Sequence, residues 1–457
     1  MVERRRQDSR KAEKPRDSRP YIGDVGRRPE GALDIATVTI GLVVLALIVG
    51  CVIGFAVFCV MRLSTWLTEL LWNNLGGSLS VPWFPLLVCT IGGALIGVWT
   101  WWSHDSVKPL EQVMAEFKAT GSYKTQGAVK PVITFLLPLV FGGSIGFEAG
   151  LTGLITAGCC WIRDKLKAAG LRAGAVAEVT IAASLAAIFG TPLAGIVAGA
   201  ESAPGDTGDV LEEPDVNDFT MRRGAKVVLY TAAAFGAFGG VTLFSFLFGA
   251  SSGLPRFEPI TAAYTELLWV VPCLIVAYAM AFIYHGSNRL FATVSKRMGD
   301  QGASTILKPV IAGIVMGAIA MALPYVLFSG ETQSEELMQT WTAWTAVALL
   351  GTGVLKAFVT PLCLNMGWVG GNFFPSIFAG VAAGYGLAAI TGADPMLMVT
   401  VTATAFLAGV IRKPLLVLAI LFLCFPVQGL FWMGLAAIVG AALPLPRFLL
   451  NAPEGAE

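Results

Sequence analysis

The chain has 457 residues, of which 55% are hydrophobic and only 13% are charged. Soluble domains carry about a quarter charged residues, so this composition excludes an ordinary water-soluble protein and indicates an integral membrane protein. The formal net charge is +1, and we expect no nucleic-acid partner.

The chain begins with a polar, basic segment. Its first thirty residues contain ten Lys or Arg and no apolar stretch. This pattern predicts a disordered basic tail over residues 1–32 instead of a cleavable signal peptide, and the positive-inside rule places it in the cytoplasm. The segment from Ile40 to Met61 then contains no charged residue, and it is long enough for a helix to cross the bilayer, which takes about 20 residues.

Many further apolar runs follow, and several are short or interrupted by glycine and proline. With 52 glycines and 24 prolines, the chain is typical of a channel or transporter built from interrupted, tilted helices. We therefore predict an all-α polytopic membrane protein, with a transmembrane domain over residues 33–450 and a short C-terminal tail over residues 451–457. The further apolar runs are residues 79–102, 131–140, 152–162, 176–200, 227–250, 267–283, 309–328, 343–364, 377–390, 396–411 and 415–444.

An internal repeat divides this domain. A glycine pair opens a helical pattern at Gly142 and again at Gly370, 228 residues later. A Pro-Leu turn follows each pair, at Pro192 and at Pro414, which are 222 residues apart. Because repeats in transporters are often inverted and hold the site where they meet, we expect two inverted, structurally related halves. The predicted halves are residues 33–225 and 226–450.

The glycine pairs have a chemical consequence. A helix that begins directly after such a pair presents free backbone amides and a partial positive charge to whatever lies in front of it. Two helix starts that meet near the membrane midplane would hold an anion without a Lys or Arg, weakly enough for release. One glycine pair could equally be a helix-packing kink, but two pairs with matched Pro-Leu turns favour an anion site.

The residues at these turns resemble the CLC family, which includes voltage-gated chloride channels and chloride/proton antiporters. Residues 371–375, Gly-Asn-Phe-Phe-Pro, resemble the family's GxFxP motif. Residues 146–150, Gly-Phe-Glu-Ala-Gly, resemble its G(K/R)EGP motif, with Phe147 in place of the basic residue. Weaker likenesses are found at residues 189–201, 408–415 and 105–109, the last keeping only the serine and proline of GSGIP.

The resemblance covers residues 35–450 and implies a divergent, prokaryotic-type member without cytoplasmic regulatory domains. It further implies a homodimer in which each subunit has its own pathway for chloride or a related anion. Glu148 would be the gate, because a carboxylate at an anion-attracting helix start competes with the ion and leaves when protonated. The anion-binding residues that the resemblance implies are Ser106, Gly146, Phe147, Gly371, Asn372 and Phe373.

Two departures from the family pattern bear on mechanism. Proton-coupled members resembling this chain carry an inner glutamate where this chain has Ser202, and a hydroxyl cannot carry protons near neutral pH. We therefore favour weakly coupled or uncoupled chloride flow, while the alternative is a proton-coupled chloride, fluoride or nitrate antiporter that uses Glu201 as proton relay. The family's central tyrosine has no counterpart, since no tyrosine follows Tyr385. The retained Ser106 favours chloride over fluoride.

Other functions find little support in the sequence. The eight cysteines and two histidines show no metal-ligand spacing, and no cluster of His, Asp or Cys lies inside the apolar runs. We expect no enzymatic activity, cofactor or metal, which argues against a rival interpretation as a membrane enzyme acting on lipid phosphates. A channel for uncharged solutes stays open as another rival. The expected location is the plasma (inner) membrane, in a lipid bilayer crossed several times, with both termini cytoplasmic.

Overall fold

The computed structural model describes most of the transmembrane domain. The chain forms two compact units, Met1–Leu42 and Val43–Glu457, and every contact discussed below lies within the second. The described residues are 30–76, 81–103, 129–153, 155, 174–202, 223–249, 255–262, 264–299 and 301–446.

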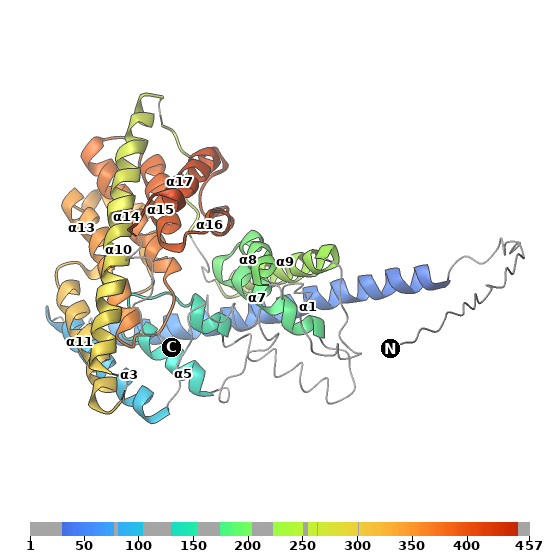
Figure 1. Cartoon of the computed structure of the whole chain (residues 1–457), viewed down its shortest axis with the longest axis horizontal. Helices are drawn as coiled ribbons and strands as arrows, with labels where there is room; N and C mark the ends of the chain where they lie inside the picture. The colour runs from blue at the N-terminus through green and yellow to red at the C-terminus, as the bar shows by residue number, and fades with distance from the viewer. Residues whose placement is uncertain are drawn as a thin grey trace, which may run out of the picture. The chain divides into compact units, whose positions relative to one another are not determined.

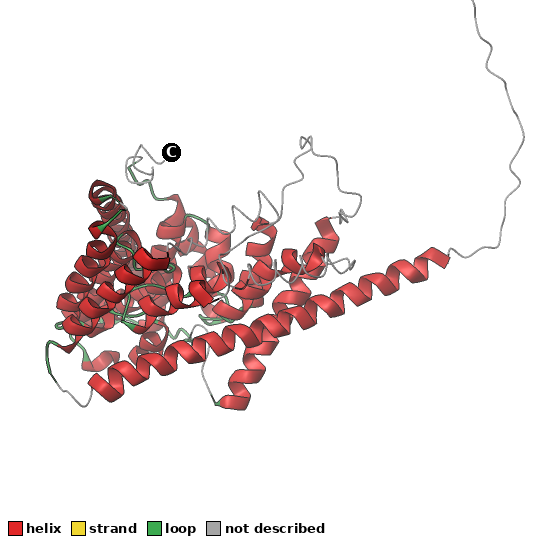
Figure 2. Cartoon of the chain, turned by 90° about the horizontal axis from the view of Figure 1, so that it is seen from below, coloured by secondary structure: helices red, strands yellow, loops and turns green. Residues whose placement is uncertain are grey.

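Most residues in these ranges are helical, and the ranges contain no β-strand (Figure 1, Figure 2). Seven of their helices are long and apolar enough to cross a membrane. The predicted class of an all-α polytopic membrane protein is therefore confirmed. The labelled α-helices are α1 (Glu30–Glu69), α3 (Phe84–Ser103), α5 (Val129–Val140), α7 (Gly174–Phe189), α8 (Pro192–Ser202), α9 (Arg223–Phe248), α10 (Val270–Met298), α11 (Ala303–Ala320), α12 (Glu331–Thr340), α13 (Ala346–Asn365), α14 (Phe373–Thr391), α15 (Pro395–Ile411), α16 (Pro414–Leu421) and α17 (Leu430–Ala442).

Short turns of other helix types join some of these helices. They are the π-helical turn η1 (Leu70–Leu75) and the 3-10 turns η2 (Tyr264–Trp269), η3 (Pro324–Val326), η4 (Trp341–Ala343) and η5 (Val427–Gly429). Two of the predicted apolar runs prove to be two helices each. The run at 176–200 breaks at Gly190, whose φ of 64° ends α7, and the run at 415–444 breaks at η5 between α16 and α17.

The core lies around α14 and α15. Nearly every residue of these two helices is buried, as expected for helices that are apolar on all faces. Helix α14 packs against α13 and α15, and α15 packs in turn against α10 and α17. Helix α14, which begins two residues after the second glycine pair, is therefore held on several sides.

Small residues allow the backbones of α3 and α11 to approach closely. Gly93 of α3 and Gly313 of α11 lie at this crossing, where a methyl group on Gly93 would collide with the Pro309 carbonyl and one on Gly313 with the Cys89 carbonyl. Because lipid supplies no hydrophobic force between helices, such close packing is a main source of their association.

Replacing Gly313 with valine is expected to destabilise the fold. The added side chain would force α3 and α11 apart, at a cost of about 1–3 kcal/mol. The thermal unfolding of the purified protein in detergent measures this loss. Gly434→Val in α17 is the matched control, because a Cβ there meets nothing within 4 Å. Equal melting of the two variants would contradict the packing argument.

Candidate functional site

The structure brings the two glycine turns together. The amide of Gly146 donates to the carbonyl of Gly371 at 2.8 Å, and the amide of Gly371 donates to the carbonyl of Gly146 at 2.7 Å. This reciprocal pair is an isolated antiparallel bridge between segments 225 residues apart. The turns from the two predicted halves therefore meet, with a helical stretch starting at residue 148 on one side and α14 starting at Phe373 on the other.

The carboxylate of Glu148 lies directly in front of this junction. Its Oε1 accepts a hydrogen bond from the backbone amide of Phe373 at 2.6 Å, and the side chain is fully buried. A Cβ on either Gly146 or Gly371 would collide with the carboxylate, so both glycines are needed for this close approach. Because the Phe373 amide belongs to the first turn of α14, it has no carbonyl partner within its own helix. A negative group therefore occupies the helix start.

Four phenylalanine rings pack against one another beside the start of α14. The ring of Phe147 lies 4.4 Å from that of Phe374, and the ring of Phe189 stacks on Phe374 at 5.2 Å. Phe189 also contacts Phe373 at 5.5 Å, and all four side chains are buried. The rings place apolar surface beside the start of α14, and a low local dielectric strengthens the attraction between an amide and an anion.

The side chain of Asn372 does not bind the amides at the start of α14. Asn372 is the N-cap residue of α14, a position where asparagine often accepts a bond from its own helix, but it makes no such bond here. Its Nδ2 instead donates to the hydroxyl of Tyr284 in α10 at 3.2 Å, and Tyr284 is buried. Tyr284 was not anticipated from the sequence, and it fixes the side chain of a predicted site residue.

A buried lysine supports the first glycine turn. Lys356 of α13 is fully buried, and its Nζ lies 5.0 Å from the ring centre of Phe378. Its ammonium group shares three N–H donors among four consecutive backbone carbonyls, at 2.8–3.3 Å. These carbonyls belong to Tyr325, Val326, Leu327 and Phe328.

The segment held by Lys356 is bonded to the glycine turn. The amide of Phe328 donates to the carbonyl of Gly142 at 3.1 Å. One turn beyond Lys356 on α13, the hydroxyls of Thr360 and Ser144 are 3.2 Å apart. Helix α13 thus positions the first-half turn through two routes. The sequence signal for Lys356 was its place as a lone charge in the apolar run 343–364.

The structure does not describe the side chains of two predicted site residues, Ser106 and Glu201. Ser106 lies outside the described residues. Glu201 and Ser202 lie in the last turn of α8, and only their backbone is described. Helix α8 contacts α16, its counterpart after the second Pro-Leu turn, and the Thr191 hydroxyl donates to the Ala419 carbonyl at 3.3 Å. Corresponding helices of the two halves therefore meet at a second place.

The sequence has recognisable relatives. The family profile described as "Voltage gated chloride channel" matches residues 104–444. Two curated proteins of Arabidopsis thaliana, chloride channel proteins CLC-f and CLC-e, are 29% and 28% identical over 152 and 155 residues. The matches cover 31% and 30% of this chain but only 19% and 22% of those proteins, so they span about a fifth of the relatives' length.

Solved structures share the fold. A CLC-type fluoride/proton antiporter superposes with a TM-score of 0.66, at 16% identity, over 91% of this chain and 96% of that one. A slow cyanobacterial Cl−/H+ antiporter gives 0.63 at 16% identity, over 88% and 94%. A eukaryotic CLC transporter gives 0.63 at 15% identity, over 88% and 70%. At these identities the likeness concerns the arrangement of helices.

Proposed function

The chain belongs to the voltage-gated chloride channel (CLC) family, and we propose that it carries small anions across the membrane past the paired glycine turns. The resemblance read from the glycine motifs is thereby confirmed at the level of the family. The observation that carries the proposal is the bond from the Phe373 amide to Glu148, because a helix start already holds a negative group there. A small anion in place of the carboxylate would accept a hydrogen bond from the same amide.

In this proposal Glu148 is the gate. Its carboxylate and the transported anion compete for the same amide, so the pathway opens when the carboxylate is protonated or displaced. The amides of Asn372 and Phe373, together with the turn at Gly146, Phe147 and Gly371, form the anion site. Ser106 would add a hydroxyl from the preceding half. No full positive charge is needed, which permits rapid release.

Chloride is the proposed substrate, with weak or no coupling to protons, because Ser202 stands where a proton relay is expected. The alternative is a proton-coupled antiporter that uses Glu201 and carries chloride, fluoride or nitrate. Two of the solved structures that share this fold are described as proton antiporters, one for fluoride and one for chloride, which supports the alternative.

Anion flux from liposomes containing the purified chain tests the proposal. Chloride is expected to leave faster than fluoride, and an imposed chloride gradient is expected to move few protons uphill. Stoichiometric uphill proton movement would instead favour the antiporter. Absence of flux for chloride, fluoride and nitrate alike, in liposomes shown to contain folded protein, would contradict anion transport itself.

The molecular context is also a proposal. We infer a homodimer with one pathway in each subunit, embedded in the plasma (inner) membrane with both termini on the cytoplasmic side. The bounds of the transmembrane domain, residues 33–450 with halves at 33–225 and 226–450, stay a prediction. The mass of the purified particle and the accessibility of engineered terminal cysteines from each side of the membrane test these points.

A further inference from the structure

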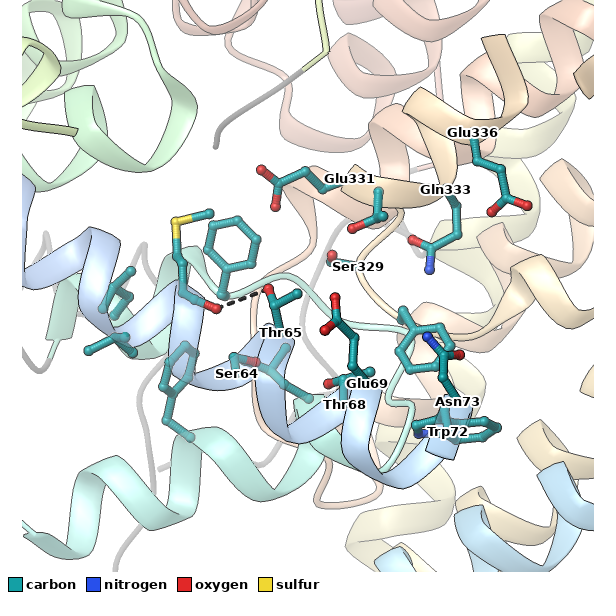
Figure 3. A pocket seen from close by; sticks show the side chains of 18 residues that line it. Ser64, Thr65, Thr68, Glu69, Trp72, Asn73, Ser329, Glu331, Gln333 and Glu336 are labelled. Carbon is teal, nitrogen blue, oxygen red and sulfur yellow. Dashed lines mark hydrogen bonds between the residues drawn. The ribbon is translucent and has the colours of Figure 1, made fainter. Parts of the chain in front are cut away.

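A cavity of about 410 Å3 opens beside the first glycine turn (Figure 3). Phe147 and Leu151, which flank Glu148 in the chain, form part of its wall. The remaining walls come from the ends of α1 and η1, from α5, and from α12 with the turn before it. This volume lies in the range of about 300–1,000 Å3 that is typical of small-molecule sites.

The described wall of this cavity is negatively charged. It contains three carboxylates, Glu69 from α1 and Glu331 and Glu336 from α12, and none of the described lining residues is Lys or Arg. Figure 3 shows Glu69 approaching from one side and the α12 residues from the other. Such a wall repels chloride, so the cavity does not suit the anion itself.

Glu336 has a neutral neighbour. Burial, and then the hydrogen bond with Glu336, raise the pKa of Tyr325 to about 12. The tyrosine therefore keeps its proton at physiological pH and donates a hydrogen bond to the Glu336 carboxylate.

Aromatic rings form the apolar part of the same wall. Trp72 is fixed by a hydrogen bond from its Nε1 to the Val140 carbonyl at 2.9 Å, and it packs edge-on against Phe328 with ring centres 5.1 Å apart. Together with Phe147 these rings give a rigid apolar surface, and aromatic faces attract cations.

We propose that this cavity binds a small organic ammonium ion with an apolar body. The charged nitrogen would lie among Glu69, Glu331 and Glu336, and the apolar part would rest on Trp72 and Phe147. The spacing of the carboxylates favours this occupant over a metal ion. Within the described part of the chain, no three His, Cys, Asp or Glu side chains are close enough together to hold one. A larger cation can instead be attracted by carboxylates that are too dispersed to coordinate a metal.

An occupant would also restrain the gate. Phe147 precedes Glu148 directly, and its ring packs on Phe374 at the start of α14. A ligand pressed against Phe147 would hinder the movement that releases the carboxylate from the Phe373 amide. This second consequence rests on the proposed function, whereas binding itself does not.

Direct binding to the purified full chain in detergent tests the proposal. Calorimetric titration uses three probes of similar size: 2-phenylethylammonium, neutral 2-phenylethanol and anionic 3-phenylpropionate. The ammonium ion is expected to bind at least about tenfold more tightly than the alcohol, and the carboxylate not at all. Equal binding of the cation and the alcohol, or no binding of the cation, would overturn the proposal.

Variants then locate the site. Glu69→Gln and Glu336→Gln are each expected to weaken binding of the ammonium ion about five- to tenfold. Glu335→Gln is the matched control, because Glu335 lies on α12 beside Glu336 but does not line the cavity, and it should leave binding unchanged. A loss in the control equal to that in the other two would rule out this cavity as the site. Unaltered melting curves exclude unfolding as the cause.

Transport is measured separately. In liposomes, 2-phenylethylammonium is expected to slow anion flux through the unaltered chain more than through Glu69→Gln. Binding without any change in flux would overturn the restraint on Glu148. Binding by a chain that moves no anion would contradict the proposed function and leave the ammonium site intact.

Discussion

Replacing Glu148 with alanine is expected to raise anion flux and to remove the dependence of flux on pH. In the unaltered chain the Glu148 carboxylate accepts a hydrogen bond from the Phe373 amide at 2.6 Å. We propose that the anion binds to this same amide. A hydrogen bond to a charged group contributes about 1.5–3 kcal/mol, which corresponds to an occupancy factor of about ten to a hundred and fifty. The flux gain should lie between several-fold and this upper bound.

The sign of the pH effect follows from the same competition. Protonation removes the negative charge with which Glu148 competes, so flux through the unaltered chain should rise as the pH falls. Alanine has no group to titrate, and flux through the variant should therefore stay level over the range from about pH 4 to pH 7. Chloride efflux from liposomes prepared at a series of pH values measures both effects.

Two further variants separate charge from size. Glu148→Gln keeps the shape of the protonated side chain and should remove the pH dependence while giving a smaller rise in flux than alanine. Glu258→Gln, at an exposed position, should behave like the unaltered chain. If Glu148→Ala kept the full pH dependence of the unaltered chain, another residue would have to be the gate.

The meeting of the two glycine turns could be anticipated because its requirement is local. A carboxylate that approaches a helix start closely leaves no room for a side chain, and this holds at Gly146 and Gly371. The glycine pairs at Gly142 and Gly370 drew attention to the two segments in which these residues lie. The mutual bonds of Gly146 and Gly371 are less local. They depend on how α13, α14 and the first-half helices pack, and no spacing in the sequence specifies that packing.

The supporting residues were missed for a related reason. Tyr284 resembles many other aromatic residues of an apolar chain, and only the fold shows that it bonds to Asn372. Lys356 gave a clearer signal, because a lone charge in an apolar run needs polar partners. Its partners are main-chain carbonyls 28–31 residues earlier in the chain. Because every residue has such a carbonyl, the residue types do not indicate which ones bind the lysine.

Helix breaks were anticipated only where one residue type causes them. Gly190 and Pro192 mark the boundary between α7 and α8, and the turn there was recognised as a motif. The break between α16 and α17 follows from Pro426 together with its packing, since Phe257 donates its amide to the Cys424 carbonyl at 2.8 Å. The apolar run at 415–444 contains Pro426, which is compatible with a break, but its apolar pattern alone does not separate one long helix from two short ones.

Replacing Lys356 with methionine is expected to cause the largest loss of stability among single changes near the site. Methionine fills a similar volume but leaves four buried or half-buried carbonyls without their donor. Breaking a buried charged network by removing one partner typically costs about 3–5 kcal/mol. Thermal unfolding in detergent should show this loss, while Lys296→Met, at an exposed position, should not.

The same change should also impair transport in the molecules that stay folded. Without Lys356 the segment ending at Phe328 is no longer fixed, and its bond to the Gly142 carbonyl positions the first glycine turn. Lys356→Arg keeps the charge and the donors, so it should recover part of both stability and flux. If Lys356 only stabilised the fold, lowering the temperature alone would restore the flux of Lys356→Met.

A double variant decides how Lys356 acts. If Lys356 shaped only the gate, removing the gate in Lys356→Met/Glu148→Ala would restore flux to the level of Glu148→Ala. We expect no such recovery, because the amides of the anion site depend on the turn that Lys356 holds in place. Full recovery in liposomes with equal amounts of folded protein would show instead that Lys356 serves the carboxylate of Glu148 and leaves the anion site untouched.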